Sequence, residues 1–305
     1  MQEWNVFCNR TTLERLFYVS KSYQGLVAYS VGDSDSGDMS PDKKLTALPN
    51  PSFIARISAL VEREQRTRYA GGPLGYFWAF VGPISWIAFV VVFFRIIGRQ
   101  PPLQVGVEVF VATGILPYAL WRQNLQMIMR TVIANRHMTA YDRIDSRELA
   151  ISSSILEYGT NLMTAAVIFG VFAMLFDVSL PADTLKVLMS FFAVWVLGAG
   201  VGSLFASIGQ VSDSFHRGVQ VILRPLFWIS GLFFTATELP ASTISLFWWN
   251  PLFHCIDALR EGLFLGFQSP ISSLWYPIVF GAVCFLLAMH IMVYVDDNRL
   301  SRHPL

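Results

Sequence analysis

The sequence is dominated by long stretches that carry no charged side chain. Four of them cover residues 76–94, 158–176, 187–212 and 262–295. An α-helix rises about 1.5 Å per residue, so roughly 20 apolar residues cross about 30 Å of bilayer hydrocarbon. A helix satisfies its own backbone groups there, which irregular chain in contact with lipid cannot do. The sequence therefore predicts an all-α membrane protein.

Two further apolar stretches contain charges. Residues 107–129 include Glu108 and Arg122, and residues 219–237 include Arg224. A charged side chain at the bilayer centre costs at least about 3 kcal/mol, so both arginines are expected to face protein, water or headgroups. With these two, the predicted transmembrane helices are six, near 76–94, 107–129, 155–176, 186–208, 219–237 and 276–294.

The distribution of Lys and Arg predicts the orientation. With the amino terminus placed in the cytoplasm, eleven Lys or Arg near the span ends lie on the cytoplasmic side and four on the other side. Cytoplasmic loops carry the excess of positive charge in membrane proteins. Both termini are therefore expected in the cytoplasm, with residues 297–305 as a cytoplasmic tail.

The composition excludes several classes of protein. Charged residues make up 14% of the 305 residues and hydrophobic residues 54%, with a net charge of +1. Ordinary globular chains have about 25% charged residues, so this chain cannot cover a soluble surface. No dense Lys/Arg cluster suggests a nucleic-acid partner. Cys8, Cys255 and Cys284 are too scattered for a metal site or disulfide framework, and the last two are read as buried packing residues.

The amino-terminal region divides into two parts. Residues 1–50 are polar and uneven and predict a flexible cytoplasmic segment, with Met39 as an alternative start of translation. Asn50 and Pro51 then form a helix start signal. We expect an amphipathic interface helix over 51–69 that lies on the cytoplasmic membrane surface. The alternative is a helix that packs on another subunit.

The cytoplasmic loop between the second and third spans carries two capping-box patterns. Thr139 with Asp142 and Asp145 with Glu148 each place an acid three residues after a cap residue. They predict a short helix near 140–144 and a new helix that enters the third span. Such a projecting helix could dock a soluble partner; the alternative is a solvated loop.

An apolar segment on the outer side, residues 238–275, is too long for a tight connection. Irregular chain is excluded from lipid, so we expect re-entrant external helices before the last span. An Asn-Pro pair at 250–251 predicts a helix start. The helix that follows places Asp257, Arg260 and Glu261 within one turn, where mutual pairing or contact with substrate would be possible.

The chain lacks the motifs of the common catalytic sites. It contains no GxSxG, HExxH, CxxC or GxxxxGK[ST] pattern. His254 and His290 lie in apolar surroundings and are read as packing residues. We therefore predict no catalytic residue, no metal and no cofactor on this chain, and no hydrolysis of ATP by it.

Three GxxxG spacings allow helices to approach closely in lipid and make a homodimer possible. They are Gly71 with Gly75, Gly198 with Gly202, and Gly262 with Gly266.

Two sequence segments resemble a known family. RYAGGPLGYFWAFVGPI at 68–84 and NPLFHCIDALREGLFLGF at 250–267 resemble segments of ABC-2-type transporter permeases that export polysaccharides. The similarity extends over roughly 52–296. The whole pattern looks most like the inner-membrane permease of bacterial capsular polysaccharide exporters.

This resemblance implies a homodimer that works with two copies of a separate ATPase subunit, which binds ATP and Mg. Its substrate would be a lipid-linked glycan, passed on to periplasmic and outer-membrane components. Alternatives are an O-antigen or teichoic acid exporter, a drug exporter of the same fold, or a membrane-embedded acyl or glycosyl transferase. In the family the loop between the second and third spans docks the ATPase, which here implies Thr139, Ala140, Tyr141, Asp142, Arg143, Ile144 and Asp145.

Aromatic and cationic residues within the spans suggest a path for a glycan. Aromatic rings stack on the apolar faces of sugars, whereas Arg attracts anionic groups. The Trp side chains could instead be interface anchors, and Arg122 could pair with Glu157 across two spans. The candidate path residues are Trp86, Tyr118, Trp121, Arg122, Arg224 and Trp228.

Overall fold

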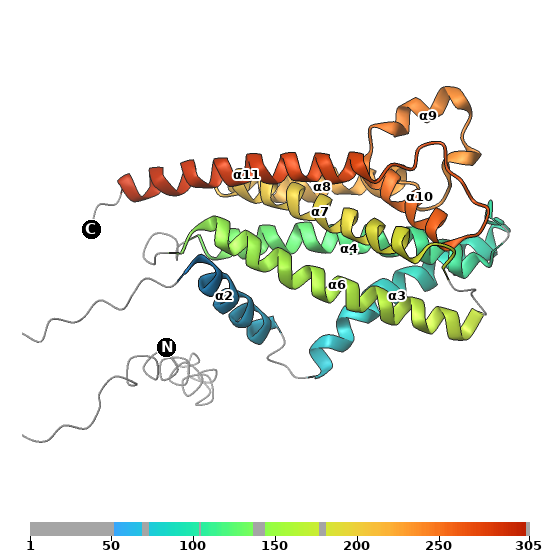
Figure 1. Ribbon diagram of the computed structural model, residues 1–305, viewed down its shortest axis with the longest axis horizontal. Coiled ribbons are helices and arrows are strands. Elements are labelled where there is room, and N and C mark those ends of the chain that lie inside the picture. Colours follow the sequence, from blue (N-terminus) through green and yellow to red (C-terminus); the bar gives the residue numbers. More distant parts are fainter. Residues whose placement is uncertain (1–51, 69–72, 104, 137–143, 177–180, 303–305) are drawn as a thin grey trace, which may run out of the picture. The chain divides into compact units, whose positions relative to one another are not determined.

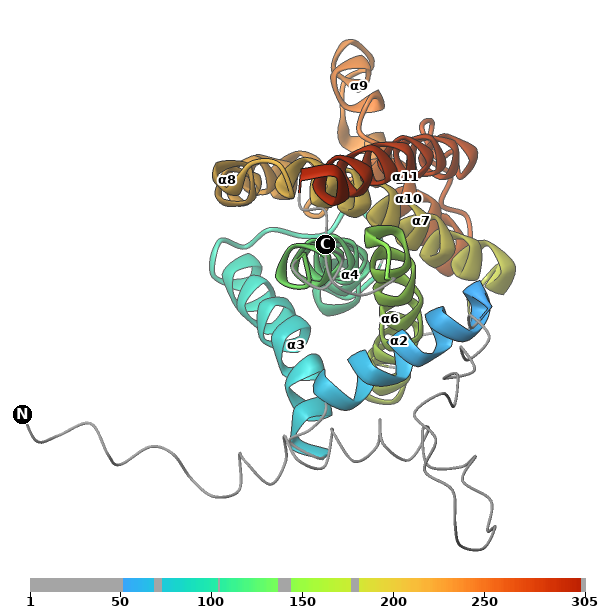
Figure 2. The same cartoon turned by 90° about the vertical axis from the view of Figure 1, so that its left-hand side faces the viewer.

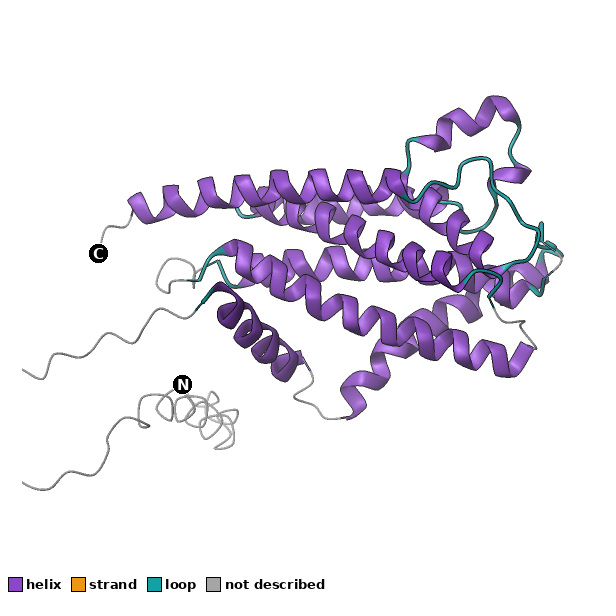
Figure 3. Ribbon diagram, viewed as in Figure 1, coloured by secondary structure: helices purple, strands orange, loops and turns teal. Residues whose placement is uncertain are grey.

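The computed structural model describes residues 52–68, 73–103, 105–136, 144–176 and 181–302 (Figure 1). All regular elements in these ranges are helical, which confirms the predicted class (Figure 3). Residues 51–305 form one compact unit. The predicted flexible segment 1–50 and the alternative start at Met39 lie outside the described residues.

The helices follow one another as α2 (Phe53–Arg68), α3 (Pro73–Ile96), α4 (Val107–Ala134), α6 (Ser146–Phe176), α7 (Thr184–Gly209), α8 (Asp213–Ile229), the short 3₁₀ helix η2 (Ala236–Glu238), α9 (Ala241–Trp248), α10 (Pro251–Leu263) and α11 (Trp275–Arg302).

Three of the described helices are long and apolar enough to cross a membrane. They are α6, α7 with its C-terminal extension to Val211, and the part of α11 from Trp275 to Asn298. They match the third, fourth and sixth predicted spans. The first and second predicted spans fall on α3, whose apolar run Phe80–Ile96 is shorter, and on the more polar α4. The count of six spans stays a prediction.

The predicted fifth span is wrong in its boundaries. Instead of 219–237, α8 covers Asp213–Ile229. The chain leaves the helix at Ser230, and Gly231 follows with φ of 74°, a conformation that glycine adopts without strain. A buried arginine, described below, holds the carbonyl groups of this turn.

Helix α7 packs between α4 and α11 through glycines (Figure 2). A Cβ atom on Gly198 would lie 2.8 Å from Asn124 Nδ2 of α4, and one on Gly202 would lie 2.8 Å from Leu125 Cα. On the α11 side, a Cβ atom on Gly200 would lie 2.0 Å from the Gly281 carbonyl oxygen. The Gly198 and Gly202 pair therefore serves packing within the chain and is no sign of a homodimer contact.

Helix α2 packs on α6 of the same chain. Leu60 is buried in this contact, and the Arg56 guanidinium lies 2.7 Å from Glu148 Oε1 of α6. The helix lies within the predicted range 51–69. Its position on a membrane surface stays a prediction.

The predicted capping box at the start of α6 is wrong. Glu148 does not reach back to Asp145, because its carboxylate accepts from Arg56. Asp145 itself accepts from Arg147. The first backbone N–H of α6 donates instead to Asp296 of α11, at 3.0 Å.

The predicted short external helices are present as α9 and α10. Asn250 caps α10 by accepting from the Leu252 backbone N–H at 3.1 Å, and Pro251 occupies the first turn, as predicted. Helix α10 is almost entirely buried, whereas α9 has no buried residue and projects away from α11 (Figures 1 and 2). Whether these helices enter the membrane stays a prediction.

Candidate functional site

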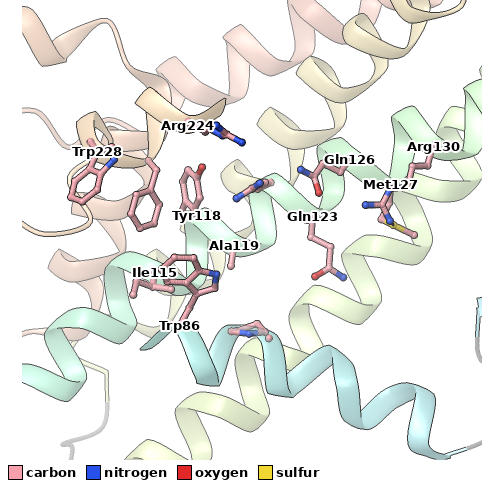
Figure 4. Close-up of a pocket in the computed structure, with 14 residues that line it drawn as sticks. Trp86, Ile115, Tyr118, Ala119, Gln123, Gln126, Met127, Arg130, Arg224 and Trp228 are labelled. Atoms are coloured by element: carbon pink, nitrogen blue, oxygen red, sulfur yellow. The ribbon is translucent and has the colours of Figure 1, made fainter. Parts of the chain in front are cut away.

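Helices α3, α4 and α8 enclose an open cavity of about 630 Å³ (Figure 4). Helix α4 forms its floor, and α3 and α8 form its two walls. The lining side chains come from Gly82, Pro83 and Trp86 of α3, from Ile115, Tyr118, Ala119, Arg122, Gln123, Gln126, Met127 and Arg130 of α4, and from Arg224, Phe227 and Trp228 of α8. We call this cavity the α4 groove.

The contribution of α4 follows from helical periodicity. Its lining residues recur every three or four positions from Ile115 to Arg130, so they share one face of the helix. Fifteen residues of α-helix span roughly 22 Å, which is most of the hydrocarbon thickness of a bilayer. The α4 groove is therefore elongated along the helix and not a closed ligand pocket.

The structure brings five of the six predicted path residues together. Trp86, Tyr118, Arg122, Arg224 and Trp228 all line the α4 groove.

Trp121 does not line the cavity, although the sequence placed it in the path. It lies one position before Arg122 and so faces another side of α4, where it is buried with an exposed fraction of 4%. Its ring centroid lies 5.9 Å from that of Tyr118. This residue packs behind the floor of the groove.

One part of the groove is aromatic. The ring centroid of Phe227 on α8 lies 5.1 Å from that of Tyr118 on α4 and 5.8 Å from that of Trp86 on α3. Trp86 and Trp228 remain 51% and 65% exposed. Large aromatic faces that stay accessible can stack on the apolar faces of sugar rings.

The polar part of the groove is cationic. Arg122, Arg130 and Arg224 line it together with Gln123 and Gln126, and no Asp or Glu of the described residues does so. The lining therefore favours an anionic ligand over a neutral or cationic one.

Two hydrogen bonds fasten α8 to α4 across the groove. Tyr118 donates through its hydroxyl to the Leu223 carbonyl at 3.0 Å, and Gln126 donates to Gln220 at 3.0 Å. Glu157, the alternative partner considered for Arg122, is buried in α6 and accepts from Gln123 at 3.3 Å.

Sequence reasoning missed several lining residues, namely Gln123, Gln126, Arg130 and Phe227. The signal that could have found three of them is their spacing. Gln123, Gln126 and Arg130 continue the helical face of Tyr118 and Arg122 toward the end of α4, and polar residues on one face of an apolar helix indicate a protein or water contact.

Helix α10 is held by a fully buried arginine. Arg260 donates to the carbonyl oxygens of Gly231, Leu232 and Phe234 at 2.8, 3.0 and 2.9 Å and pairs with Asp257 at 3.3 Å. The expected pairing of these two residues is confirmed. Both side chains have an exposed fraction of 0%, so neither can contact a substrate in this conformation.

Glu261 does not join that pair. It forms an ion pair with Lys186 of α7 and accepts from Ser272 at 2.6 Å. The carboxylate thus fastens the segment after α10 to the beginning of α7. The three charged residues of α10 are all used in contacts that pack α10 against neighbouring segments.

The predicted docking segment is described only in part. Thr139, Ala140, Tyr141, Asp142 and Arg143 lie outside the described residues. Ile144 and Asp145 are half-buried and directly precede α6.

Most of the remaining reactive side chains pack in the interior, but His290 of α11 is exposed, so the prediction that it packs in the interior is wrong. Cys255 and Cys284 are buried free thiols, as predicted, and His254 lies with Nε2 at 2.8 Å from the Trp248 carbonyl oxygen. Among the residues with described positions, no group of three or more His, Cys, Asp or Glu could hold a metal ion.

Comparison with known proteins gives related permeases. The polysialic acid transport protein KpsM of Escherichia coli is 24% identical over 248 residues, which cover 80% of this chain and 95% of KpsM. The capsule polysaccharide export inner-membrane protein BexB of Haemophilus influenzae is 25% identical over 233 residues, or 76% of this chain and 88% of BexB.

The capsule polysaccharide export inner-membrane protein CtrC of Neisseria meningitidis is 21% identical over 236 residues, or 77% of this chain and 89% of CtrC. A model of the ABC-2 type transporter family matches residues 55–264. The resemblance seen in the sequence motifs is therefore confirmed. Since the match covers more than half of the chain, the protein belongs to the ABC-2 type transporter family.

Proposed function

We propose that this chain is the membrane subunit of an exporter that moves lipid-linked capsular polysaccharide across the bacterial inner membrane. Family membership and relatives that are named for capsule polysaccharide export support this function. The structural observation that carries it is the α4 groove, which combines accessible aromatic rings with three arginines, two on α4 and one on α8.

The groove would form part of the path for the polymer. A sliding glycan needs many weak contacts and no single strong one, because a tightly held chain does not move. Trp86, Phe227 and Trp228 offer stacking contacts, and Arg122 and Arg224 attract carboxylate or phosphate groups of the polymer or its lipid anchor.

A second copy of the chain would close the open side of the groove. The walls expose large apolar side chains next to it, among them Phe89 on α3 and Val221 on α8, each 64% exposed. In the proposed homodimer these faces lie against the other subunit or against lipid. The proposal keeps six transmembrane helices, with both termini in the cytoplasm.

The driving force would come from two copies of a separate ATPase subunit that binds ATP and Mg. Residues 139–145 would dock this subunit, because they directly precede the long helix α6. Closure of the ATPase dimer on ATP would then displace α6. On the outer side, α9 and α10 would dip into the membrane as re-entrant helices and face the periplasmic and outer-membrane components.

The proposal is tested by removing the positive charge of the groove. We expect Arg122→Ala together with Arg224→Ala to lower the polysaccharide on the cell surface at least about tenfold and to leave the amount of permease in the membrane unchanged. Arg217→Ala, an exposed arginine of α8 outside the groove, is the matched control. Normal export by the double variant would contradict a role of the groove in transport.

A further inference from the structure

The first turn of α6 is built around a carboxylate from the opposite end of the sequence. Ser146 donates through its backbone N–H to Asp296 Oδ2 at 3.0 Å and through its hydroxyl to Asp296 Oδ1 at 2.9 Å. Ser146 is fully buried and Asp296 is 9% exposed. A single carboxylate of α11 thus holds both polar groups of the residue that begins α6.

The acceptor that caps the start of α6 comes from an unusual place in the sequence. The first N–H groups of a helix need acceptors, and the residue just before the helix commonly supplies one. Here the acceptor lies 150 positions away in the sequence. Its negative charge is favoured at a helix N-terminus, and a hydrogen bond to a buried charged group is stronger than a neutral one. The cap therefore joins two helices, whereas a local cap would stabilise only one.

The same serine contacts the turn that leads into α8. Its hydroxyl lies 3.2 Å from Gln210 Oε1. Gln210 is the C-cap residue, directly after the last residue of α7. A serine hydroxyl carries one proton, which it can donate to Asp296 or to Gln210. Helix α8 begins three residues later, at Asp213, and bears Arg224 and Trp228 of the α4 groove.

The first turn of α6 is also bound to α2. Glu148, buried two residues after Ser146, accepts from Arg56 at 2.7 Å. Leu149 and Ala150 are buried as well. The first turn of α6 is thus fixed to α2, to the end of α7 and to α11, and it directly follows Asp145, the last residue of the proposed docking segment.

We propose that Ser146 and Asp296 form a coupling junction, through which a displacement of α6 by the ATPase reaches α11 and the α7–α8 turn, and so the wall of the α4 groove. This inference rests on the proposed function. Asp296 and Ser146 act as positioning residues, since neither lines the groove.

Further along α6 the bonds lead to other helices. Asn161 donates to the Leu120 carbonyl of α4 at 3.3 Å, and the Ser154 carbonyl accepts from Trp195 of α7 at 2.9 Å. These bonds hold α6 within the helix bundle but do not reach α11. The junction connects α11 to α6 at the end where the proposed docking segment enters.

The test uses the full chain with its ATPase subunit, in cells and in detergent. The variants are Asp296→Ala, Asp296→Asn and Ser146→Ala, and the matched control is Asp297→Ala, an exposed carboxylate next in the chain. Four quantities are measured: permease in the membrane, copurified ATPase, ATP hydrolysis, and polysaccharide extracted from the cell surface and assayed as total carbohydrate.

We expect all three junction variants to keep the ATPase bound and hydrolysing ATP but to export less polymer per ATP, about tenfold less for Asp296→Ala and a smaller loss for Ser146→Ala, which keeps the backbone hydrogen bond to Asp296. Asp296→Asn, which keeps one oxygen acceptor, should lose less than Asp296→Ala. The double variant Ser146→Ala with Asp296→Ala should be no worse than Asp296→Ala alone, because Asp296→Ala already removes both hydrogen bonds to Ser146. Asp297→Ala should behave as the unmodified protein.

Normal export per ATP in all three variants would overturn the proposal. Loss of all three from the membrane would overturn it as well, because the contact would then be a folding determinant alone. If only the Asp296→Ala permease is lost from the membrane, the export per ATP of Asp296→Asn and Ser146→Ala tests the proposal. Failure of the unmodified chain to bind an ATPase would instead overturn the proposed function and is seen in the same experiment.

Discussion

The region around α10 and the α4 groove both use arginine, but in opposite ways. Arg260 is fully buried and donates to three carbonyl groups, to Asp257 and to Thr113. Arg224 is exposed at the groove, and no Asp or Glu of the described residues lines that cavity. A buried arginine whose three nitrogen atoms all bind acceptors within the chain stabilises a fold, whereas one that faces an open cavity without a counter-charge is available to bind a ligand.

The largest expected effect is on stability and follows from Arg260. Arg260→Ala leaves Asp257 as an unpaired buried charge and removes the donors of three carbonyl groups. We expect the free energy of unfolding in detergent to fall by about 3–5 kcal/mol. Urea or heat unfolding, followed by helix content, measures it. If Arg260→Ala lowers the free energy of unfolding no more than Arg217→Ala does, Arg260 does not stabilise the fold.

For the two groove arginines we predict the opposite: a small change in stability and a large loss of export. Arg122→Ala with Arg224→Ala should change the free energy of unfolding by less than about 1 kcal/mol, since the buried Tyr118 hydroxyl, a hydrogen-bond partner of Arg122, keeps its bond to the Leu223 carbonyl. Export should nevertheless fall at least about tenfold, as stated above. A large loss of stability with unchanged export per folded molecule would place these arginines in the same class as Arg260.

A smaller effect is expected from a single aromatic residue. Trp228→Ala removes one accessible ring from the groove, and stacking contacts are worth about 0.5–1.5 kcal/mol, so export should fall roughly two- to tenfold. Phe280→Ala, which truncates a partly exposed ring of α11 outside the groove, is the control. Equal losses from the two variants would argue against stacking in the groove.

The smallest effect is expected at Trp121, the residue that the sequence placed in the path and the structure places behind it. Its indole N–H is buried and has no hydrogen-bond acceptor among the residues that the structure describes. Trp121→Phe removes this unsatisfied donor and keeps an aromatic ring, so stability should change by less than about 1 kcal/mol. Export should stay normal. A strong export defect of Trp121→Phe would indicate that Trp121 contacts the polymer during export.

Local patterns in the sequence predicted much of this arrangement. Long apolar runs predict α6, α7 and α11, because a membrane crossing needs length and apolarity alone. Asn250 with Pro251 predicts the start of α10, since a cap and a first-turn proline act within a few residues.

Contacts between distant segments could not be predicted in this way. The end of α8 is set by Arg260, about thirty residues further along, and the start of α6 by Asp296, 150 residues further. For the groove, charge within an apolar helix identified Arg122 and Arg224. That Arg260 would be fully buried and bound to the carbonyl groups after α8, and Trp121 turned away from the groove, follows only from how the helices pack.

The account is tested most directly by asking which residues touch the polymer during export. A photoreactive benzoylphenylalanine at Ala119, on the floor of the α4 groove, is compared with one at Val283, on the exposed face of α11. In cells that are exporting polysaccharide, illumination should attach carbohydrate to the permease from position 119 and not from position 283. Attachment from position 283 alone, or from neither position while export proceeds, would contradict the α4 groove as the path.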